Sequence, residues 1–351
     1  MHVDPQSVAG RTAGRFLKSL AISRGDMSAA VSYASGQNWL DSKSIVDVIQ
    51  KGNVSGLDSS SFALTEPGKS FFETLTPTSI LSKLTGARRV PLLTRCITFD
   101  SGSTGYSATE GKAVPISAAA LSGDTVEPRH HVGIVVATNE LLRTPGSETA
   151  LARDLARAVT AAENASFLAT VAGGILFGGS TQASAGATLT NIDTDVAFAV
   201  GALITAGSTL ENAVWICSPV NAAALAAKRG TGGGPAFPDV RYDGGRLAGI
   251  PLITSTSAGN LLILLDLDNI VIAEGGGVQL STSSVTSLEM LDDVPAVPPA
   301  IGAAIGDVLA PVVSTQVSLY QSNATALKCD LYRGWLSRST AAAAYLSAAS
   351  Y

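Results

Sequence analysis

Charged residues, histidine and cysteine are all scarce in this sequence of 351 residues. Lys, Arg, Asp and Glu together make up 15% of it, against about 25% in a typical soluble protein. There are three histidines and three cysteines, and there is no run of 18 or more apolar residues. The last absence argues against a membrane-spanning helix. The length allows roughly two domains, each with a core of its own.

The low charge content has two interpretations. One is a coding bias toward Ala and Gly, and the other is an exterior that other subunits cover, where charge would be costly to desolvate. Composition alone leaves both open. The net charge of −5 argues against sequence-specific DNA binding, which requires clustered Lys and Arg, but not against a container for DNA.

The cysteines do not form a recognisable pattern. Cys96, Cys217 and Cys329 are odd in number and far apart, so we expect neither a disulfide framework nor a zinc site, but three buried small apolar residues. Residues 1–10 lack the positive start and apolar run of a secretory signal. Folding in a reducing cytoplasm is therefore expected.

No catalytic constellation is evident. His130 and His131 precede a predicted strand, where neighbouring side chains point to opposite faces and do not easily bind one metal. Glycine clusters lie at 173–179, 230–234 and 275–277. None ends in Gly-Lys-Ser/Thr, and none forms GxGxxG between a strand and a helix, so neither phosphate-binding pattern is present. We therefore predict no catalytic, metal or cofactor site, and a protein that is not an enzyme.

A short basic amphipathic helix is predicted near the start of the chain. Arg11, Arg15 and Lys18 recur at helical spacing between residues 7 and 25, opposite an apolar side. The helix is either an ordinary docked helix with a solvated face or an arm that contacts a partner, a membrane-like surface or packaged nucleic acid. Residues 52–61 are typical of a linker.

Residues 95–131 contain hardly any large apolar side chains. At their centre, Tyr106 to Pro115 reads YSATEGKAVP, and glycines and prolines on both sides favour turns and extended chain. A hairpin with arms of about 15 residues would reach on the order of 50 Å. A loop of this length is held by something external or is functional, because it has no core of its own.

The remainder alternates helices and strands. A strand near 131–138 precedes a long amphipathic helix expected over Glu148 to Thr170. From Asn191 the chain predicts a separate α/β lobe, with its first helix capped by Asp193 or Thr194. The last segment, 312–351, is predicted to end in a hairpin that returns to the first domain, which would make the lobe an insertion.

In this order, several stretches resemble the major capsid proteins of tailed bacteriophages, the HK97-fold family. They are ATEGKAVPIS followed by NELL, the helix ending ENASFLA, AVWICSP with AALAAKRG, GGRLAGIPLITS, LLILLDLDNIVIAEGGGVQLSTS, and ALKCDLYRGW. No single stretch is specific. The resemblance lies in their order and spacing over roughly residues 66 to 340.

The resemblance implies an α+β HK97-like capsid fold. Its parts would be an N-arm at 1–65, a peripheral (P) domain with a long spine helix, an extended β-hairpin E-loop at 95–131, and an inserted α/β axial (A) domain at 191–306. The P domain would combine residues 66–94, 132–190 and 307–351. The E-loop of this family lies across a neighbouring subunit, which would explain the missing core.

The implied function is self-assembly into pentamers and hexamers of an icosahedral shell that encloses double-stranded DNA of a tailed phage. The chain would be part of the virion after assembly in the host cytoplasm, without cofactors. Implied partners are further copies of itself, a portal protein, a scaffolding protein and a decoration protein. Alternatives are an encapsulin-type nanocompartment, a gene-transfer particle, and an α/β enzyme with a ligand site near residues 230–234.

The implied contact residues lie in two places. In the E-loop they are Tyr106, Glu110, Lys112, Val114, Ile116, Glu127 and Arg129, and in the N-arm they are Arg11, Arg15 and Lys18. Some relatives crosslink an E-loop lysine to a neighbour's asparagine, but no asparagine lies between Asn269 and Asn323, so we expect Lys112 to pair with a carboxylate instead. Because only about 65 residues precede the P domain, scaffolding is expected to be a separate protein.

Overall fold

The structure is a computed structural model. It describes residues 11–23, 26–37, 39, 41–55, 79–101, 120–144, 147–230, 232–284, 287–291, 314–339 and 342–351. The chain divides into two compact units. The first comprises residues 1–74, 133–156 and 278–330, and the second comprises residues 75–132, 157–277 and 331–351. We describe each unit by itself.

The first unit holds α1 (Arg11–Ile22), α2 (Met27–Gly36), α3 (Ser42–Ser55), α7 (Asn139–Arg143), β12 (Ser287–Leu291) and β13 (Ser314–Ser318). Four elements continue from one unit into the other along the chain: β4 (Arg129–Thr138), α8 (Ser147–Phe167), β11 (Ile270–Ser283) and β14 (Ala324–Ser337). The predicted long helix is thus confirmed as α8. The stretch IVIAEGGGVQLSTS forms one strand, β11.

The second unit holds the remaining elements. They are α6 (Ile80–Lys83), β1 (Arg88–Val90), β2 (Arg95–Ser101), β3 (Ala120–Thr125), β5 (Ser180–Ala183), α9 (Leu189–Thr205), β6 (Ala213–Cys217), α10 (Pro219–Ala227), β7 (Val240–Arg241), β8 (Gly244–Leu247), β9 (Ile250–Thr254), β10 (Leu262–Asp266) and β15 (Ala343–Ser347). Two short 3-10 helices, η2 (Thr256–Ala258) and η3 (Leu267–Asn269), flank β10.

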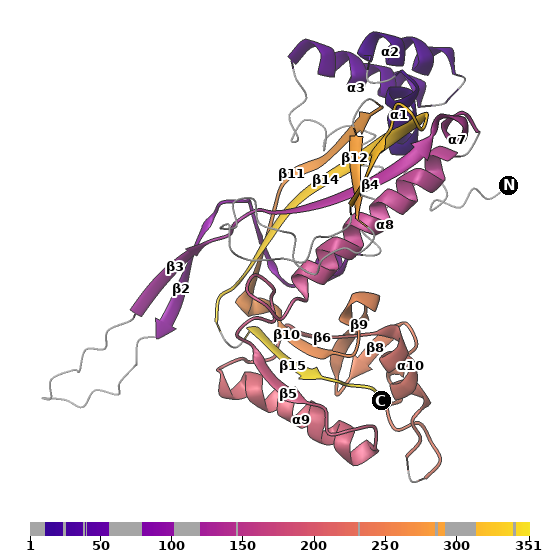
Figure 1. Cartoon of the computed structure of the whole chain (residues 1–351). Helices are drawn as coiled ribbons and strands as arrows, with labels where there is room; N and C mark the ends of the chain where they lie inside the picture. Colours follow the sequence, from indigo (N-terminus) through magenta and orange to yellow (C-terminus); the bar gives the residue numbers. More distant parts are fainter. Residues whose placement is uncertain are drawn as a thin grey trace, which may run out of the picture. The chain divides into compact units, whose positions relative to one another are not determined.

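The three N-terminal helices form a packed layer with their own core. The buried residues come from all three helices: Phe16, Leu20, Ala30, Ala34, Ile45, Val48 and Ile49. Helix α2 begins where the Asp26 carboxylate accepts hydrogen bonds from the backbone N–H groups of Ser28 and Ala29. Hydrogen bonding to the charged form lowers the pKa of Asp26. Helices α1, α2 and α3 are therefore docked on one another with a shared apolar centre (Figure 1).

A seven-stranded sheet forms the centre of the second unit, in the order β5-β15-β10-β6-β9-β8-β7. Its central strands β6 and β10 are buried throughout. Successive side chains of a strand point to opposite faces, so Leu262 and Leu264 enter one core while Ile263 and Leu265 enter another. We call this sheet, with α9 and α10, the lobe (Figure 1).

The helices of the lobe begin earlier than predicted. Thr188 caps α9 by accepting from the Asn191 N–H, where Asp193 or Thr194 had been expected. Asp195 is instead buried and accepts from Ser184 and Tyr351. The cap is a threonine placed after a loop. About two turns further along the helix, Asp195 accepts hydrogen bonds from Ser184 and Ala185 of that loop.

The end of the chain corrects the prediction of a closing hairpin. Strand β15 lies inside the lobe sheet, parallel to β5 and antiparallel to β10. Its small residues allow this position, because Ala344 and Leu346 fill one core and Ala343 the other. Beyond it, the Asn221 side chain donates to the Ala349 carbonyl. The lobe therefore requires the last residues for its sheet.

Removing residues 343–351 should abolish cooperative unfolding of the lobe, because β5 and β10 would each lose a paired neighbour. Circular dichroism with urea titration measures this. The Tyr351→Phe variant serves as the control, since it removes one hydrogen bond to Asp195 and should cost only about 1 kcal/mol. A truncated chain that unfolds like the full chain would contradict the central role of β15.

Candidate intersubunit surfaces

The β2–β3 hairpin is a two-stranded sheet of its own. Arg95 pairs with Thr125 and Ser101 with Ala120, and a register shift lies between Phe99 and Ser101. Among the described residues no third strand joins it (Figure 1). Ile97 is 61% exposed. A two-stranded ribbon is marginally stable at best in water, so this hairpin presents edges and apolar surface that another chain can cover. The predicted hairpin is confirmed in these strands.

The hairpin is anchored at its base. The Leu93 N–H donates to the Val126 carbonyl, and the Val126 N–H donates to the Thr94 carbonyl. Val126 and Cys96 are buried beside Val271. The ribbon therefore starts from a fixed position rather than from a free loop.

Three side chains and a loop converge on the indole of Trp335. The Arg129 guanidinium lies 4.8 Å from the ring centroid, the His131 ring stacks at 5.8 Å, and the Phe167 ring meets it edge-on at 5.4 Å. The indole N–H donates to the Gly173 carbonyl at 2.9 Å. Such contacts favour one arrangement of β4, β14, α8 and the loop after α8. We call these five residues the Trp335 cluster.

Gly173 is needed where the loop after α8 passes Arg129. Its φ of +103° is one that other residues rarely adopt, and a Cβ there would approach Arg129 Nη1 to 2.5 Å. Burial lowers the pKa of Arg129, and the nearby Glu127 carboxylate acts in the opposite direction. The Arg129 Nε is buried and has no acceptor among the described residues.

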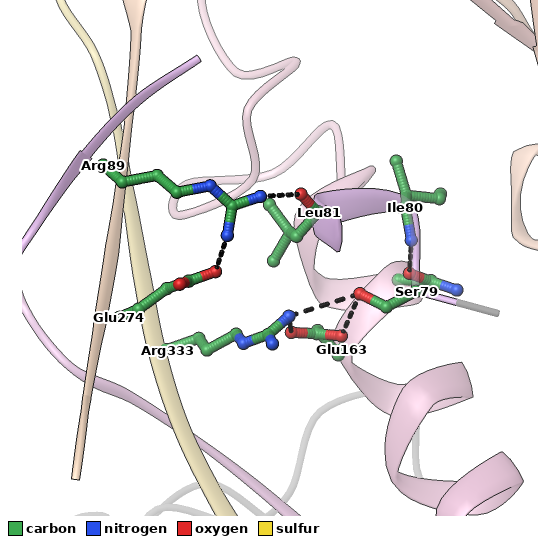
Figure 2. A network of polar contacts seen from close by, with 8 residues as sticks. Ser79, Ile80, Leu81, Arg89, Glu163, Glu274 and Arg333 are labelled. Atoms are coloured by element: carbon green, nitrogen blue, oxygen red, sulfur yellow. Dashed lines mark hydrogen bonds and ion pairs between the residues drawn. The ribbon is translucent and has the colours of Figure 1, made fainter. Parts of the chain in front are cut away.

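A buried ion pair lies next to this cluster (Figure 2). Arg333 Nη1 donates to Glu163 Oε1 at 2.8 Å, and the side chains of Glu163 and Arg333 are 1% and 10% exposed. The Ser79 hydroxyl donates to the other Glu163 oxygen at 2.7 Å. The Ile80 N–H donates to the Asn164 side-chain oxygen at 2.9 Å. The pair thereby joins α8, β14 and the start of α6.

The ion pair and the Trp335 cluster share one geometric origin. Glu163 and Phe167 are four residues apart on α8, a rise of about 6 Å. Arg333 and Trp335 are two residues apart on β14, a rise of about 6.6 Å, and point to the same face. The two spacings are nearly equal. The helix and the strand can therefore form the Glu163–Arg333 ion pair and the Phe167–Trp335 ring contact at the same time.

A second polar contact of the same region is more exposed. The Arg89 guanidinium pairs with Glu274 and also donates to the Leu81 carbonyl (Figure 2). The two side chains of the pair are 40% and 36% exposed. Solvent screens such a pair, so it contributes little to stability.

A cavity of about 430 Å³ opens beside the Trp335 cluster. Its walls include Arg129 and Asp124 from the base of the hairpin, Trp335 and Arg338 from the end of β14, and Phe177 from the loop after α8. Phe177 is 59% exposed. Two guanidinium groups, one carboxylate and an apolar floor therefore surround one hollow.

The sequence and the structure were compared with known proteins. Residues 68–291 match the phage capsid family. The chain belongs to this family. It is also 30% identical, over 297 residues, to the capsid polyprotein of Pseudomonas phage PAJU2, covering 79% of this chain and 43% of that protein. The chain thus spans less than half of that relative's length.

Solved structures of similar fold are phage and particle capsids. A structure from Mycobacterium phage Ogopogo matches with a TM-score of 0.54 and 16% identity, over 77% of this chain and 92% of that one. The capsid of a native GTA particle matches with a TM-score of 0.51 and 15% identity, over 79% and 91%. The α+β HK97-like capsid fold is thereby confirmed. The family is one of structural virion proteins.

The predicted contact residues of the hairpin are only partly placed. Tyr106, Glu110, Lys112, Val114 and Ile116 lie outside the described residues. Glu127 is exposed and Arg129 is half-buried in the Trp335 cluster. A contact role for Arg129 is therefore compatible with its position at the cavity.

The predicted basic face of the N-arm is engaged within the first unit. Arg15 pairs with Asp41 at 2.5 Å and lies over the Trp39 ring, while Lys18 is buried and donates to the Thr144 carbonyl. Arg11 is half-buried. This arrangement favours the docked-helix interpretation over an arm that offers three free cations to a partner.

The glycine loop at 230–234 uses its own backbone groups. The Gly230 N–H donates to the Gly234 carbonyl, and the Gly233 N–H donates to the Gly230 carbonyl. A phosphate-binding loop would instead present such N–H groups to the ligand.

Among the described residues no helix is long and apolar enough to cross a membrane, and no three His, Cys, Asp or Glu side chains are grouped as for a metal ion.

Sequence reasoning missed the Glu163–Arg333 pair and the role of Trp335. Glu163 lies on the long helix between Ala162 and Asn164, and a charged residue there gives no sign of being buried. The available signal was Arg333 two residues before Trp335 in a strand that is otherwise buried. An arginine on the inner face of such a strand requires a carboxylate partner.

Replacing Glu163 by Gln should lower the free energy of unfolding by about 3 kcal/mol or more, because the buried Arg333 charge would lose its counter-ion. Urea titration measures the change, and the Glu163→Leu/Arg333→Met double variant should lose less than the sum of the single variants. Arg89→Met is the matched control and should cost less than about 1 kcal/mol. Equal losses for Glu163→Gln and Arg89→Met would contradict the assignment.

Stability should fall as the pH decreases from about 6.5 to about 4, in part through His131. Burial, with the positive charges of Arg129, Arg333 and His130, lowers the pKa of His131 from 6.5 to about 4. The unfolded chain therefore binds this proton first, and stability present above pH 6.5 is lost below it. His131→Phe should flatten the pH dependence of unfolding more than His130→Phe does, because His130 is the smallest of these causes. Equal slopes in all three proteins would contradict the prediction.

Proposed function

We propose that this chain is the major capsid protein of a tailed phage and self-assembles into pentamers and hexamers of an icosahedral shell. In this proposal residues 95–131 are the E-loop, α8 belongs to the spine of the P domain, the lobe is the main part of the A domain, and residues 1–65 are the N-arm. The domain boundaries expected from the sequence change in two places: residues 343–351 and β5 join the lobe, and β11, expected in the A domain, belongs to a separate sheet with β1, β14 and β4.

The anchored hairpin is the observation that carries the proposal. Its base is fixed by Val126 and the Trp335 cluster, while its strands have no third partner among the described residues. A rigid base positions the ribbon, and the open edges leave its contacts to be made elsewhere. In a shell of many copies, a neighbouring subunit supplies them.

The surface of the lobe supports the same function. Ile204, Val220 and Tyr242 are 53%, 76% and 71% exposed, and they lie on α9, at the start of α10 and beside β7. Single apolar residues of this kind are common on protein surfaces, but together with 15% charge they leave little that would oppose subunit packing. Each contact can be weak, because a closed shell makes many at once.

Further partners follow from the proposed role. We propose a portal protein, a scaffolding protein and a decoration protein as partners, assembly in the host cytoplasm, and double-stranded DNA as the enclosed cargo. The net charge of −5 is suited to a wall that holds DNA without sequence-specific binding.

A gene-transfer particle is the second candidate, supported by the similarity to the capsid of a GTA particle. The subunit chemistry would be the same, and the cargo would differ. Sequencing the nucleic acid inside purified particles separates the two, since a phage shell holds one genome and a gene-transfer particle holds assorted host fragments. Particles with protein cargo and no nucleic acid would instead indicate a nanocompartment.

Replacing residues 102–119 by a two-residue Asn-Gly turn should give a folded subunit that forms no closed shells. Ser101 pairs with Ala120, so a two-residue turn can close the shortened hairpin without disturbing its base. Electron microscopy and sedimentation of the purified protein measure assembly, and circular dichroism measures folding.

A second variant, with the same 18 positions filled by Gly and Ser, serves as the matched control for length. It should also fail to assemble if side chains of the hairpin make the contacts. Normal particles from the shortened variant would refute the proposed role of the hairpin. Absence of particles from the unaltered chain, even with candidate scaffolding protein present, would refute the proposed function itself.

A further inference from the structure

The cavity beside the Trp335 cluster is built as a recognition site. Its volume of about 430 Å³ lies in the range of sites that accept a small ligand or several side chains. It is held by anchored elements: the base of the hairpin, the end of β14, and a loop tied to Trp335 by a hydrogen bond. Its shape is therefore set before anything enters it.

The charged groups of the cavity favour an anionic occupant. Arg129 and Arg338 line it against a single carboxylate, Asp124. Among the residues that the structure describes, the buried Arg129 Nε lacks an acceptor, and the Arg338 side chain donates to the Ile97 carbonyl at the long distance of 3.5 Å. A carboxylate that entered would gain charge-assisted hydrogen bonds and would supply a missing acceptor.

The apolar part of the cavity narrows the choice. Phe177 is 59% exposed at its wall, and glycines 173, 174, 178 and 179 also line the cavity. A ligand with only anionic groups, such as a phosphate, would leave this surface wet. An acidic segment with small apolar side chains would cover both parts.

One segment of this chain has that composition. Residues 292–313 read DDVPAVPPAIGAAIGDVLAPVV, with three aspartates and no Lys, Arg or His. The residues that flank this segment are neighbours, because Leu291 of β12 pairs with Ser314 of β13. Eleven residues on each side would reach up to about 36 Å. By contrast, residues 102–119 carry one Glu and one Lys, so their charges cancel.

We propose that the cavity of one subunit is the socket for residues 292–313 of a second copy, with an aspartate of that segment bound between Arg129 and Arg338. The inference rests on the proposed shell function, because only an assembly brings copies together. It assigns a specific contact, a basic socket and an acidic plug, in a chain that has few charges for contacts of any kind.

Photo-crosslinking in assembled particles tests the contact directly. Phe177→p-benzoylphenylalanine places the crosslinker in the cavity wall, and Val220→p-benzoylphenylalanine is the matched control on an exposed position of the lobe. Cleavage before aspartate releases residues 293–306 and 307–329 as separate peptides, and tandem mass spectrometry locates the attachment. We expect capture of residues 292–313 from position 177 and not from position 220.

Mixed isotope labelling shows whether the contact joins two copies. Particles assembled from equal amounts of ¹⁵N-labelled and unlabelled chains should give crosslinked pairs of one heavy and one light peptide. Pairs with only matching labels would place the segment in the socket of its own chain and overturn the proposal.

The charge requirement is tested with the variant Asp292→Asn/Asp293→Asn/Asp307→Asn, which keeps side-chain size. In this variant, cleavage before aspartate releases the segment within residues 268–329. The crosslink from position 177 to that peptide should fall severalfold, while cooperative unfolding stays unchanged. An undiminished crosslink, or capture of another segment or of nucleic acid at position 177, would refute the inference. Particles would still form in those cases, so the proposed function would stand, whereas absence of particles from the unaltered chain would count against the function.

Discussion

The buried pair of Glu163 and Arg333 positions the surrounding part of the second unit. Burying two charges is costly, and this cost is offset only when the geometry fixes both groups and satisfies their remaining hydrogen bonds. The Ser79 hydroxyl donates to the second oxygen of Glu163, and the hydrogen bond from the Ile80 N–H to Asn164 fixes the start of α6 beside it. Helix α8, strand β14 and the start of α6 can therefore meet in one register, and a shift of either strand or helix would leave a bare charge inside the protein.

That register determines where the hairpin begins. Once Arg333 is fixed, Trp335 follows on the same face of β14, and its indole gathers Arg129, His131 and Phe167. Gly334, between them, lies so close to the Glu127 carbonyl that a Cβ would approach it to 2.5 Å. The position of Glu127, just after the hairpin, is thus fixed by β14. The β2–β3 hairpin has no core of its own, so its direction is set by the buried residues at its base.

The fold was predictable in those parts where local chemistry decides. Long helical periodicity gave α8, and the lack of large apolar residues between 95 and 131 predicted a hairpin that depends on outside contacts. The family followed from the order of many weak stretches. What the sequence did not reveal depends on partners distant in sequence: Glu163 is 170 positions from Arg333, and β15 could join β5 and β10 only once the lobe was folded. The N-terminal cations show the same limit, because helical spacing cannot show that Asp41 and the Thr144 carbonyl would engage them.

Scarcity of charge gives each remaining charge more weight. Exposed ion pairs such as Arg89 and Glu274 are screened and contribute little, so a subunit with few charges cannot rely on them for specific association. The Arg129 guanidinium, which lies over the Trp335 ring at the cavity, is different. Lower local polarity strengthens its attraction for one correctly placed carboxylate and raises the cost when no carboxylate binds. A few such sites would select the correct neighbour, while scattered apolar residues would add affinity without direction. With selectivity supplied by a few charged sites and affinity by apolar residues, a shell could close in one geometry even though most of its surface carries few charges.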